Sequence, residues 1–186
     1  MENNFYLSEV KVGKPVENFK ANAVLENGEF GEVSLEESMK AGKWTVLFFW
    51  PKDFTFVCPT EIRSISDSYD KFISEGIQIY GISTDTVHCH KAWRNQPINE
   101  GGIGQIKFPM LEDANHSISE QFGVLIEEEG VALRGTFIIS PEGVLESATI
   151  NNLSVGRSVD EILRTVSAFQ SGGLCSMNWS QGDSNL

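Results

Sequence analysis

The sequence predicts an α/β protein in which a central mixed β-sheet is flanked by helices. Short apolar runs alternate with segments that carry apolar residues at helical spacing, in the order strand, helix, strand, helix, strand pair and final helix. The run at 46–49 is apolar throughout, which is typical of a strand covered on both faces. This order predicts helices on both sides of one sheet.

The first elements are predicted by turn and capping signals. Residues 18–34 are expected to form a β-hairpin, because Asn27-Gly28 is a strong two-residue turn signal and the positions before it alternate in polarity. Residues 34–37 (SLEE) form a capping-box pattern, which predicts a short helix that ends near residue 42.

The segment after Cys58 carries apolar residues at a 3.6-residue period and predicts one helix that ends near Gly76. Further strands are expected at residues 77–82, 136–139 and 144–150, and further helices at residues 86–96, 115–122 and 158–170. We expect one domain over residues 1–170, followed by a polar C-terminal tail over residues 171–186.

Composition excludes several classes of function. The chain has 186 residues, with 14 Lys and Arg against 26 Asp and Glu, so its net charge of −12 argues against nucleic acid and anionic membranes as partners. Residues 1–10 show no signal segment, and the longest apolar run, 46–50, is too short to span a bilayer. Three cysteines do not suit a secreted disulfide scaffold, so we expect a soluble cytoplasmic protein.

Cys58 stands between an apolar run and an amphipathic segment. The run at 46–50 ends at Pro51, and Pro59 directly follows the cysteine. Proline is favoured at the start of a helix, where its missing N–H is not needed. Cys58 is therefore expected at or beside the helix N-cap, where free backbone N–H groups and the helix dipole favour a reactive thiolate.

Two polar residues could assist that thiol. Arg134 precedes the apolar strand expected at 136–139, where an unpaired charge would be costly to bury, and it is the best candidate for a charge partner. Thr55 could place its hydroxyl near the sulfur or near a bound oxyanion. A lone cysteine is often a buried apolar residue, but the helix start and the polar neighbours favour the reactive interpretation here.

At these residues the chain resembles a peroxiredoxin. The spacing Pro51-x-x-x-Thr55-x-x-Cys58 matches the family's motif, and residues 54–61 (FTFVCPTE) match its typical two-cysteine branch. Within that branch, the chain is most similar to the bacterial alkyl hydroperoxide reductase C group. The similarity covers nearly the whole chain and continues through residues 83–85, 90–93, 134–139 and 156–157. The resemblance implies a thioredoxin-like fold.

The resemblance also implies an activity and roles for single residues. The protein would be a thiol peroxidase that reduces hydrogen peroxide and organic hydroperoxides to water and alcohols, in antioxidant defence and redox homeostasis. Cys58 would be the peroxidatic cysteine and would become a sulfenic acid. Thr55 and Arg134 would bind the peroxide, and Pro51 would shield the site from water. The side chains that would support the active-site arginine are Glu61 and Arg157.

Cys175 fits the resolving cysteine of that family, because it lies beyond the last helix on a tail flanked by glycines. The family precedent is a disulfide between Cys58 and Cys175 of two protomers, so the unit would be a homodimer, with five dimers in a ring. The residues alone leave open a bystander cysteine and do not show that the pair crosses between chains. Ser176 stands where family members commonly have proline, whereas Trp179 keeps its expected spacing.

His88, Cys89 and His90 are ligand-type residues in adjacent positions, which cannot close a tetrahedral metal site. We therefore expect a structural histidine, an incidental thiol and no metal. Residues 101–104 (GGIG) lack the spacing of a dinucleotide-binding loop, and no cofactor is expected. They resemble a loop of overoxidation-prone two-cysteine peroxiredoxins, but the tail lacks the Tyr-Phe pair of those proteins, so we expect Cys58 to resist overoxidation.

The resemblance implies that electrons come from a partner dithiol protein. That partner would be a flavin disulfide reductase of the alkyl hydroperoxide reductase F type or a thioredoxin-like reductant, and residues 83–86 would lie near the contact between dimers. Two alternatives stay open. A dithiol–disulfide oxidoreductase would normally carry Cys-x-x-Cys, but the second position here is Glu61. A non-enzymatic holdase or structural oligomer would need no reactive thiol.

Overall fold

The structure, a computed structural model, describes residues 10–186 and confirms the expected α/β architecture. Expectations about residues 1–9, including the absence of a signal segment and the start of the domain, lie outside the described residues. The strands of the central sheet are β1 (Lys20–Val24), β2 (Phe30–Ser34), β3 (Trp44–Phe49), β4 (Ile77–Ser83), β5 (Met110–Glu112), β8 (Arg134–Ile139) and β9 (Leu145–Asn151).

These strands lie in the order β2-β1-β5-β4-β3-β8-β9. β3, β4 and β5 pair in parallel, and the other neighbours pair antiparallel, so the sheet is mixed as expected. A separate two-stranded ribbon joins β6 (Leu125–Ile126) to β7 (Val131–Ala132). The helices are α1 (Leu35–Lys40), α2 (Cys58–Asp67), α3 (Tyr69–Ser74), α4 (Val87–Asn95), α5 (Ser117–Gln121) and α6 (Val159–Gln170), with a 3-10 turn at Ile98–Glu100.

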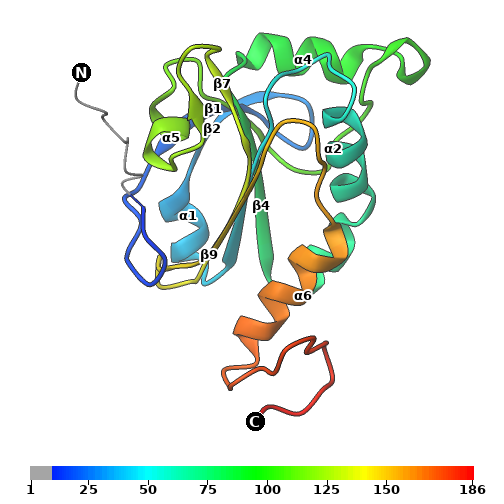
Figure 1. Ribbon diagram of the computed structural model, residues 1–186. Helices are drawn as coiled ribbons and strands as arrows, with labels where there is room; N and C mark the ends of the chain where they lie inside the picture. The colour runs from blue at the N-terminus through cyan, green and yellow to red at the C-terminus, as the bar shows by residue number, and fades with distance from the viewer. Residues whose placement is uncertain (1–9) are drawn as a thin grey trace.

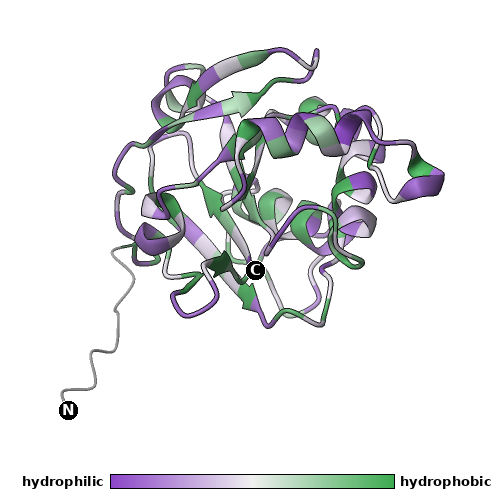
Figure 2. Cartoon of the chain, turned by 90° about the horizontal axis from the view of Figure 1, so that it is seen from above, coloured by the Kyte–Doolittle hydropathy of each residue, from purple (hydrophilic) through white to green (hydrophobic). Residues whose placement is uncertain are grey.

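The helices cover both faces of the sheet (Figure 1). On one face, Leu35 of α1 and Ile118 of α5 belong to one buried cluster. On the other face, the second cluster contains Ile62 of α2, Trp93 of α4 and Ile162 of α6. Figure 2 shows that the helices around the sheet carry both hydrophobic and hydrophilic residues, as amphipathic helices do. Within residues 10–186, no helix is long and apolar enough to cross a membrane.

Two local predictions are wrong. The segment after Cys58 forms two helices that share Ser68, because ψ at Ser68 is 5°, well outside the helical range. The bend allows Phe72 of α3 to join the core cluster on its face of the sheet. The capping box at residues 34–37 is also absent: Ser34 makes no capping bond, and Asn18 Oδ1 accepts the Glu36 N–H at 2.8 Å instead.

Other local signals are confirmed. The hairpin of β1 and β2 turns at Gly28, whose φ of 84° suits glycine. Ser158 caps α6 by accepting a hydrogen bond from the Glu161 N–H at 3.4 Å. The strands β5, β6 and β7 were not predicted, and they have only three, two and two residues. Such short strands carry too few residues for a period-2 pattern to stand out.

Gly81 in β4 provides a test of core packing. A Cβ at this position would stand 2.7 Å from Phe108 Cε2 and 2.8 Å from Trp50 Cζ3, and both rings are fully buried. Because neither ring has room to move, Gly81→Ala is expected to lower the free energy of unfolding by about 1–3 kcal/mol, measured by urea denaturation. Gly156→Ala is the control, since its Cβ would meet nothing closer than 3.5 Å. An equal loss in both variants would contradict the packing argument.

Candidate active site

The segments that carry the expected site residues meet at one edge of the sheet. β8 is antiparallel to both β3 and β9, so the end of β3, the start of β8 and the end of β9 lie together. Cys58 follows β3 through the loop of residues 50–57, and Arg134 is the first residue of β8. Arg157 follows β9 in the segment that leads to α6. Cys58, Arg134 and Arg157, which are far apart in the chain, therefore lie close together in the fold.

Cys58 is the first residue of α2 and Pro59 is the second, in agreement with the predicted helix start. The cysteine side chain is completely buried. Val57, the residue before the helix, makes no side-chain hydrogen bond to the first turn. The sulfur therefore lies at the positive end of a helix that carries no capping side chain, a position that favours negative charge.

Arg134 reaches the sulfur directly. Its Nη1 lies 3.3 Å from Cys58 Sγ and donates to Glu61 Oε2 at 2.7 Å. Its Nε donates to the Leu153 carbonyl oxygen at 2.7 Å. The guanidinium is therefore held from two sides while one nitrogen faces the thiol, a geometry that the single ammonium group of lysine could not reproduce.

Glu61 is shared between two guanidinium groups. Arg157 donates to Glu61 Oε1 from its backbone N–H at 2.8 Å and from Nε at 2.9 Å, and to Oε2 from Nη2 at 3.1 Å. Arg157 also lies over the Phe48 ring, with its guanidinium carbon 3.5 Å from the ring centre. Burial lowers the pKa of Arg157 and outweighs the opposing effect of Glu61.

The charges of this cluster balance only when Cys58 is ionised. The side chains of Arg134, Glu61 and Arg157 are all at most 5% exposed. Two guanidinium groups and one carboxylate leave a net positive charge in a buried site, which is costly unless an anion is present. A Cys58 thiolate supplies that anion. The arrangement can therefore hold a nucleophilic sulfur next to a fixed cation.

Thr55 and Pro51 lie in the loop that leads to Cys58. Pro51 is buried, and Thr55 is partly buried. The Thr55 hydroxyl donates to the Lys52 carbonyl oxygen at 2.9 Å, so its oxygen can still accept a hydrogen bond. Neither residue hydrogen-bonds to Cys58 Sγ within the described part of the chain, and their roles stay predictions.

Cys175 lies far from Cys58 in this chain. Its Sγ is 3.5 Å from the Ala168 carbonyl oxygen and 3.4 Å from Ser171 Oγ, at the end of α6. The other end of α6 adjoins Arg157 and the Cys58 cluster, and the 12 residues of this helix span about 18 Å. Figure 1 shows the tail beyond the far end of α6. The two sulfurs therefore cannot form a bond of about 2.05 Å within the chain as it is folded here.

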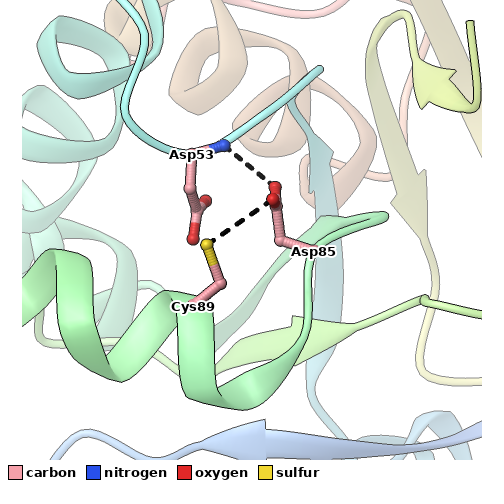
Figure 3. Close-up of side chains that lie close together, drawn as sticks. All are labelled: Asp53, Asp85 and Cys89. Atoms are coloured by element: carbon pink, nitrogen blue, oxygen red, sulfur yellow. Dashed lines mark hydrogen bonds between the residues drawn. The ribbon is translucent and has the colours of Figure 1, made fainter.

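Cys89 belongs to a cluster that was not predicted from the sequence. Its thiol lies with Asp53 and Asp85, and the ligand-type atoms of the three residues are within 4.8 Å of one another (Figure 3). Asp85 Oδ1 accepts from the Cys89 thiol at 3.6 Å, and Asp85 Oδ2 accepts from the Asp53 N–H at 2.9 Å. Burial and the two carboxylates raise the pKa of Cys89 to about 12. Cys89 is therefore a protonated thiol at neutral pH and a poor nucleophile.

His90 is fully buried and bound through both ring nitrogens. Nδ1 lies 2.7 Å from Asp53 Oδ2, and Nε2 lies 3.1 Å from the Leu111 carbonyl oxygen. Because both partners are acceptors, the ring donates from both nitrogens and carries a positive charge. Burial alone would lower the pKa of His90, but Asp53 and Leu111 together raise it. The residue is a structural histidine, as expected.

The positions of Asp53 and Asp85 in the sequence could have predicted that they lie close together. Each follows the end of one of two apolar strands, β3 and β4, that the sequence predicts. These strands turn out to be parallel neighbours, and the carboxyl ends of parallel neighbours share one edge of the sheet. Two acidic residues at these positions are therefore placed close together.

Comparison with known proteins decides the family. Residues 12–148 match the AhpC/TSA family. The chain belongs to this family, the peroxiredoxins. It is 55% identical over 180 residues to the Bacillus subtilis protein YkuU, which bears a peroxiredoxin name, covering 97% of this chain and 100% of that one. It is 50% identical over 175 residues to a thioredoxin peroxidase of Echinococcus granulosus, covering 92% and 89%.

Solved peroxiredoxin structures have the same fold. The reduced two-cysteine peroxiredoxin of Plasmodium vivax matches with a TM-score of 0.90 and 40% identity, over 94% of this chain and 91% of that one. AhpC of Enterococcus faecalis matches with a TM-score of 0.82 and 36% identity, over 95% and 99%. The expected thioredoxin-like fold and the thiol peroxidase class are thereby confirmed. Family membership favours the peroxidase interpretation over the two alternatives, a dithiol–disulfide oxidoreductase and a holdase.

Glu61→Gln tests the shared carboxylate. The variant leaves two buried guanidinium groups without their common counterion, so the free energy of unfolding is expected to fall by about 3–5 kcal/mol. Because Arg134 loses its anchor, the rate constant of Cys58 with hydrogen peroxide is expected to fall by about 10²-fold in stopped-flow measurements.

The matched control is Glu161→Gln, which removes the partner of Arg164 in an exposed ion pair. Such pairs contribute about 0–1 kcal/mol, so both measured quantities should stay close to those of the wild type. Equal effects of the two substitutions would contradict the importance of the buried cluster.

Proposed function

We propose that Cys58 is the peroxidatic cysteine of this peroxiredoxin and that it reduces hydrogen peroxide and organic hydroperoxides. The observation that carries the proposal is the contact of 3.3 Å between Arg134 Nη1 and the buried Cys58 Sγ, with Arg134 fixed by Glu61. A fixed cation stabilises the anionic sulfur and the negative charge that develops on the leaving oxygen. Because Arg134 is already held in place, its guanidinium group needs to move little during the reaction.

The first step is a two-electron oxidation of the sulfur. The Cys58 thiolate attacks one peroxide oxygen, the O–O bond breaks, and the sulfur becomes a sulfenic acid. The second oxygen leaves with the bonding electron pair and takes up a proton as water or an alcohol. Arg134 is proposed to bind the peroxide, and the Thr55 hydroxyl oxygen to accept a hydrogen bond from it. The buried Pro51 would keep water from the sulfur.

The second step joins Cys58 to Cys175 of a second copy. The Cys175 thiolate attacks the sulfenic sulfur, a disulfide forms, and hydroxide leaves and is protonated to water. The length of α6 between the two sites within one chain supports a pairing that crosses between copies. β9 is the terminal strand of the sheet order, so its outer edge offers backbone groups to a second copy.

Regeneration requires an external reductant. A dithiol donor reduces the disulfide and restores both thiols. We propose either a flavin disulfide reductase of the alkyl hydroperoxide reductase F type or a thioredoxin-like protein, in a reducing compartment such as the cytoplasm. We further propose that residues 1–170 form the catalytic domain and residues 171–186 the tail that carries the resolving thiol. Homodimers would assemble into a ring of five through contacts near residues 83–86.

Cys58→Ser tests the nucleophile. The variant retains a hydroxyl of similar size but loses the thiolate, so the single-turnover rate with hydrogen peroxide is expected to fall by roughly 10³-fold or more. Stopped-flow fluorescence measures this rate. Cys89→Ser is the control and should react like the wild type, because the Cys89 thiol is protonated at neutral pH. A rate that is unchanged in Cys58→Ser would overturn the assignment.

Cys175→Ser separates the two steps. The first oxidation should proceed within about threefold of the wild-type rate, since Cys175 lies far from the Cys58 cluster. Recycling by a dithiol donor should fall by about tenfold, because the disulfide between protomers cannot form. Non-reducing electrophoresis after one equivalent of peroxide should show a covalent dimer for the wild type only. A dimer band in Cys175→Ser would identify another thiol as the resolving one.

A further inference from the structure

The proposed reaction makes opposing demands on the loop of residues 50–57. Cys58 is completely buried next to Arg134, which suits the attack on a small peroxide. The same burial keeps the sulfur from any second thiol, and Cys175 of the same chain lies beyond the far end of α6. The disulfide step therefore requires the loop and the start of α2 to leave the closed position. The contacts that hold this loop closed would therefore set the balance between the reaction with peroxide and the formation of the disulfide.

Asp53 makes three hydrogen bonds: one to the first residue of its own loop, one to α4 and one to the segment that follows β4. Its Oδ1 accepts from Trp50 Nε1 at 2.9 Å, at the start of the loop directly after β3. Its Oδ2 lies 2.7 Å from His90 Nδ1 on α4. Its backbone N–H donates to Asp85 Oδ2 at 2.9 Å, beyond β4, as Figure 3 shows. The side chains of Asp53 and His90 are both 0% exposed, so water does not compete for these bonds.

The residue next to this anchor has an unfavourable backbone conformation. Phe54 has a φ of 55°, in the left-handed region that residues with a Cβ rarely adopt. Its ring lies against Trp93 of α4, with the ring centres 5.8 Å apart, although half of its surface is exposed. A conformation of this kind persists only where the surrounding contacts impose it. On α4, Trp93 lies against Phe54 itself and His90 binds the neighbouring Asp53, whose backbone N–H is also held by Asp85.

We propose that the buried Asp53–His90 pair is the anchor that sets the closed-to-open balance of the Cys58 loop, and that both are positioning residues for the peroxidase reaction. This inference rests on the proposed function of Cys58. His90 is itself fixed to the sheet through the Leu111 carbonyl oxygen, so the pair joins the loop to β5 through α4. Loss of the pair leaves a buried charge without its partner, and the strained loop is then released.

The expected consequence is a change in how the sulfenic acid partitions. In the closed loop, the sulfenate of Cys58 attacks a second peroxide, the O–O bond breaks, and sulfinate and an alcohol or water form. In the open loop, the sulfenic acid reacts with Cys175 to give the disulfide and water. A weaker anchor favours opening, so the ratio of sulfinic acid to disulfide should fall. This ratio compares two fates of one intermediate and does not depend on the amount of folded enzyme.

Asp53→Ala in the full-length protein tests the inference. Mass spectrometry over a hydrogen peroxide titration measures the ratio of Cys58 sulfinic acid to disulfide. This ratio should fall by about tenfold relative to the wild type, an effect of the size found when one member of a buried hydrogen-bond network is removed. Asp53→Asn should recover most of the wild-type ratio, because its amide can accept from Trp50 and donate to a neutral His90. His90→Gln, which retains one of the two His90 bonds, should shift the ratio in the same direction by less.

Thr45→Val is the matched structural control. It removes the buried hydrogen bond of 2.6 Å between Thr45 and Ser38, near the opposite end of β3. It should lower the thermal stability and leave the ratio unchanged. An unchanged ratio in both Asp53→Ala and His90→Gln would overturn the inference, as would an equal shift in Asp53→Asn and Asp53→Ala. If the wild type itself formed neither product at Cys58, the proposed function would fail, and the inference with it.

Discussion

The carboxylate of Glu61, shared between Arg134 and Arg157 and shielded from water, is the interaction on which the rest of the site depends. Two guanidinium groups around one carboxylate leave a positive charge in a buried space, and the proposed thiolate of Cys58, in contact with Arg134, would complete the balance. In the proposed reaction the nucleophile would therefore also act as a structural counterion. Such a role would offset the cost of placing a charge on a fully buried sulfur.

The sheet brings these groups together by its topology. β8 is antiparallel to both β3 and β9. The start of β8 and the segments that follow β3 and β9 therefore meet at one edge of the sheet. β4 runs parallel to β3 and adds its own following loop, with Asp85, to the same edge. The Cys58 cluster and the contacts of Asp53 are therefore neighbours: one lies directly after the loop of residues 50–57 and the other lies within it. This arrangement would link the proposed chemistry to the conformation of the loop.

The proposed reaction requires this loop to be stable in two states with a small difference in free energy. Buried hydrogen bonds to Asp53 and the charge cluster at Glu61 favour the closed state, whereas the left-handed backbone at Phe54 works against it. The tail with Cys175 sits on α6 outside this region and makes contacts with partly exposed groups. The two thiols thus lie in parts of the molecule with very different constraints, one tightly held and one near the surface.

Sequence patterns alone were enough to predict the α/β class, the helix start at Cys58 and, through the family motif, the candidate residues around it. These follow from local patterns: apolar runs, Pro59, the hairpin turn and the spacing of Pro51, Thr55 and Cys58. The folded chain was needed to show that Cys89 pairs with Asp85, that Asp53 binds His90, and that the segment after Cys58 breaks into α2 and α3. The reason is physical: local patterns fix which backbone conformations are favourable, whereas the partner of a buried charge depends on which strands become neighbours.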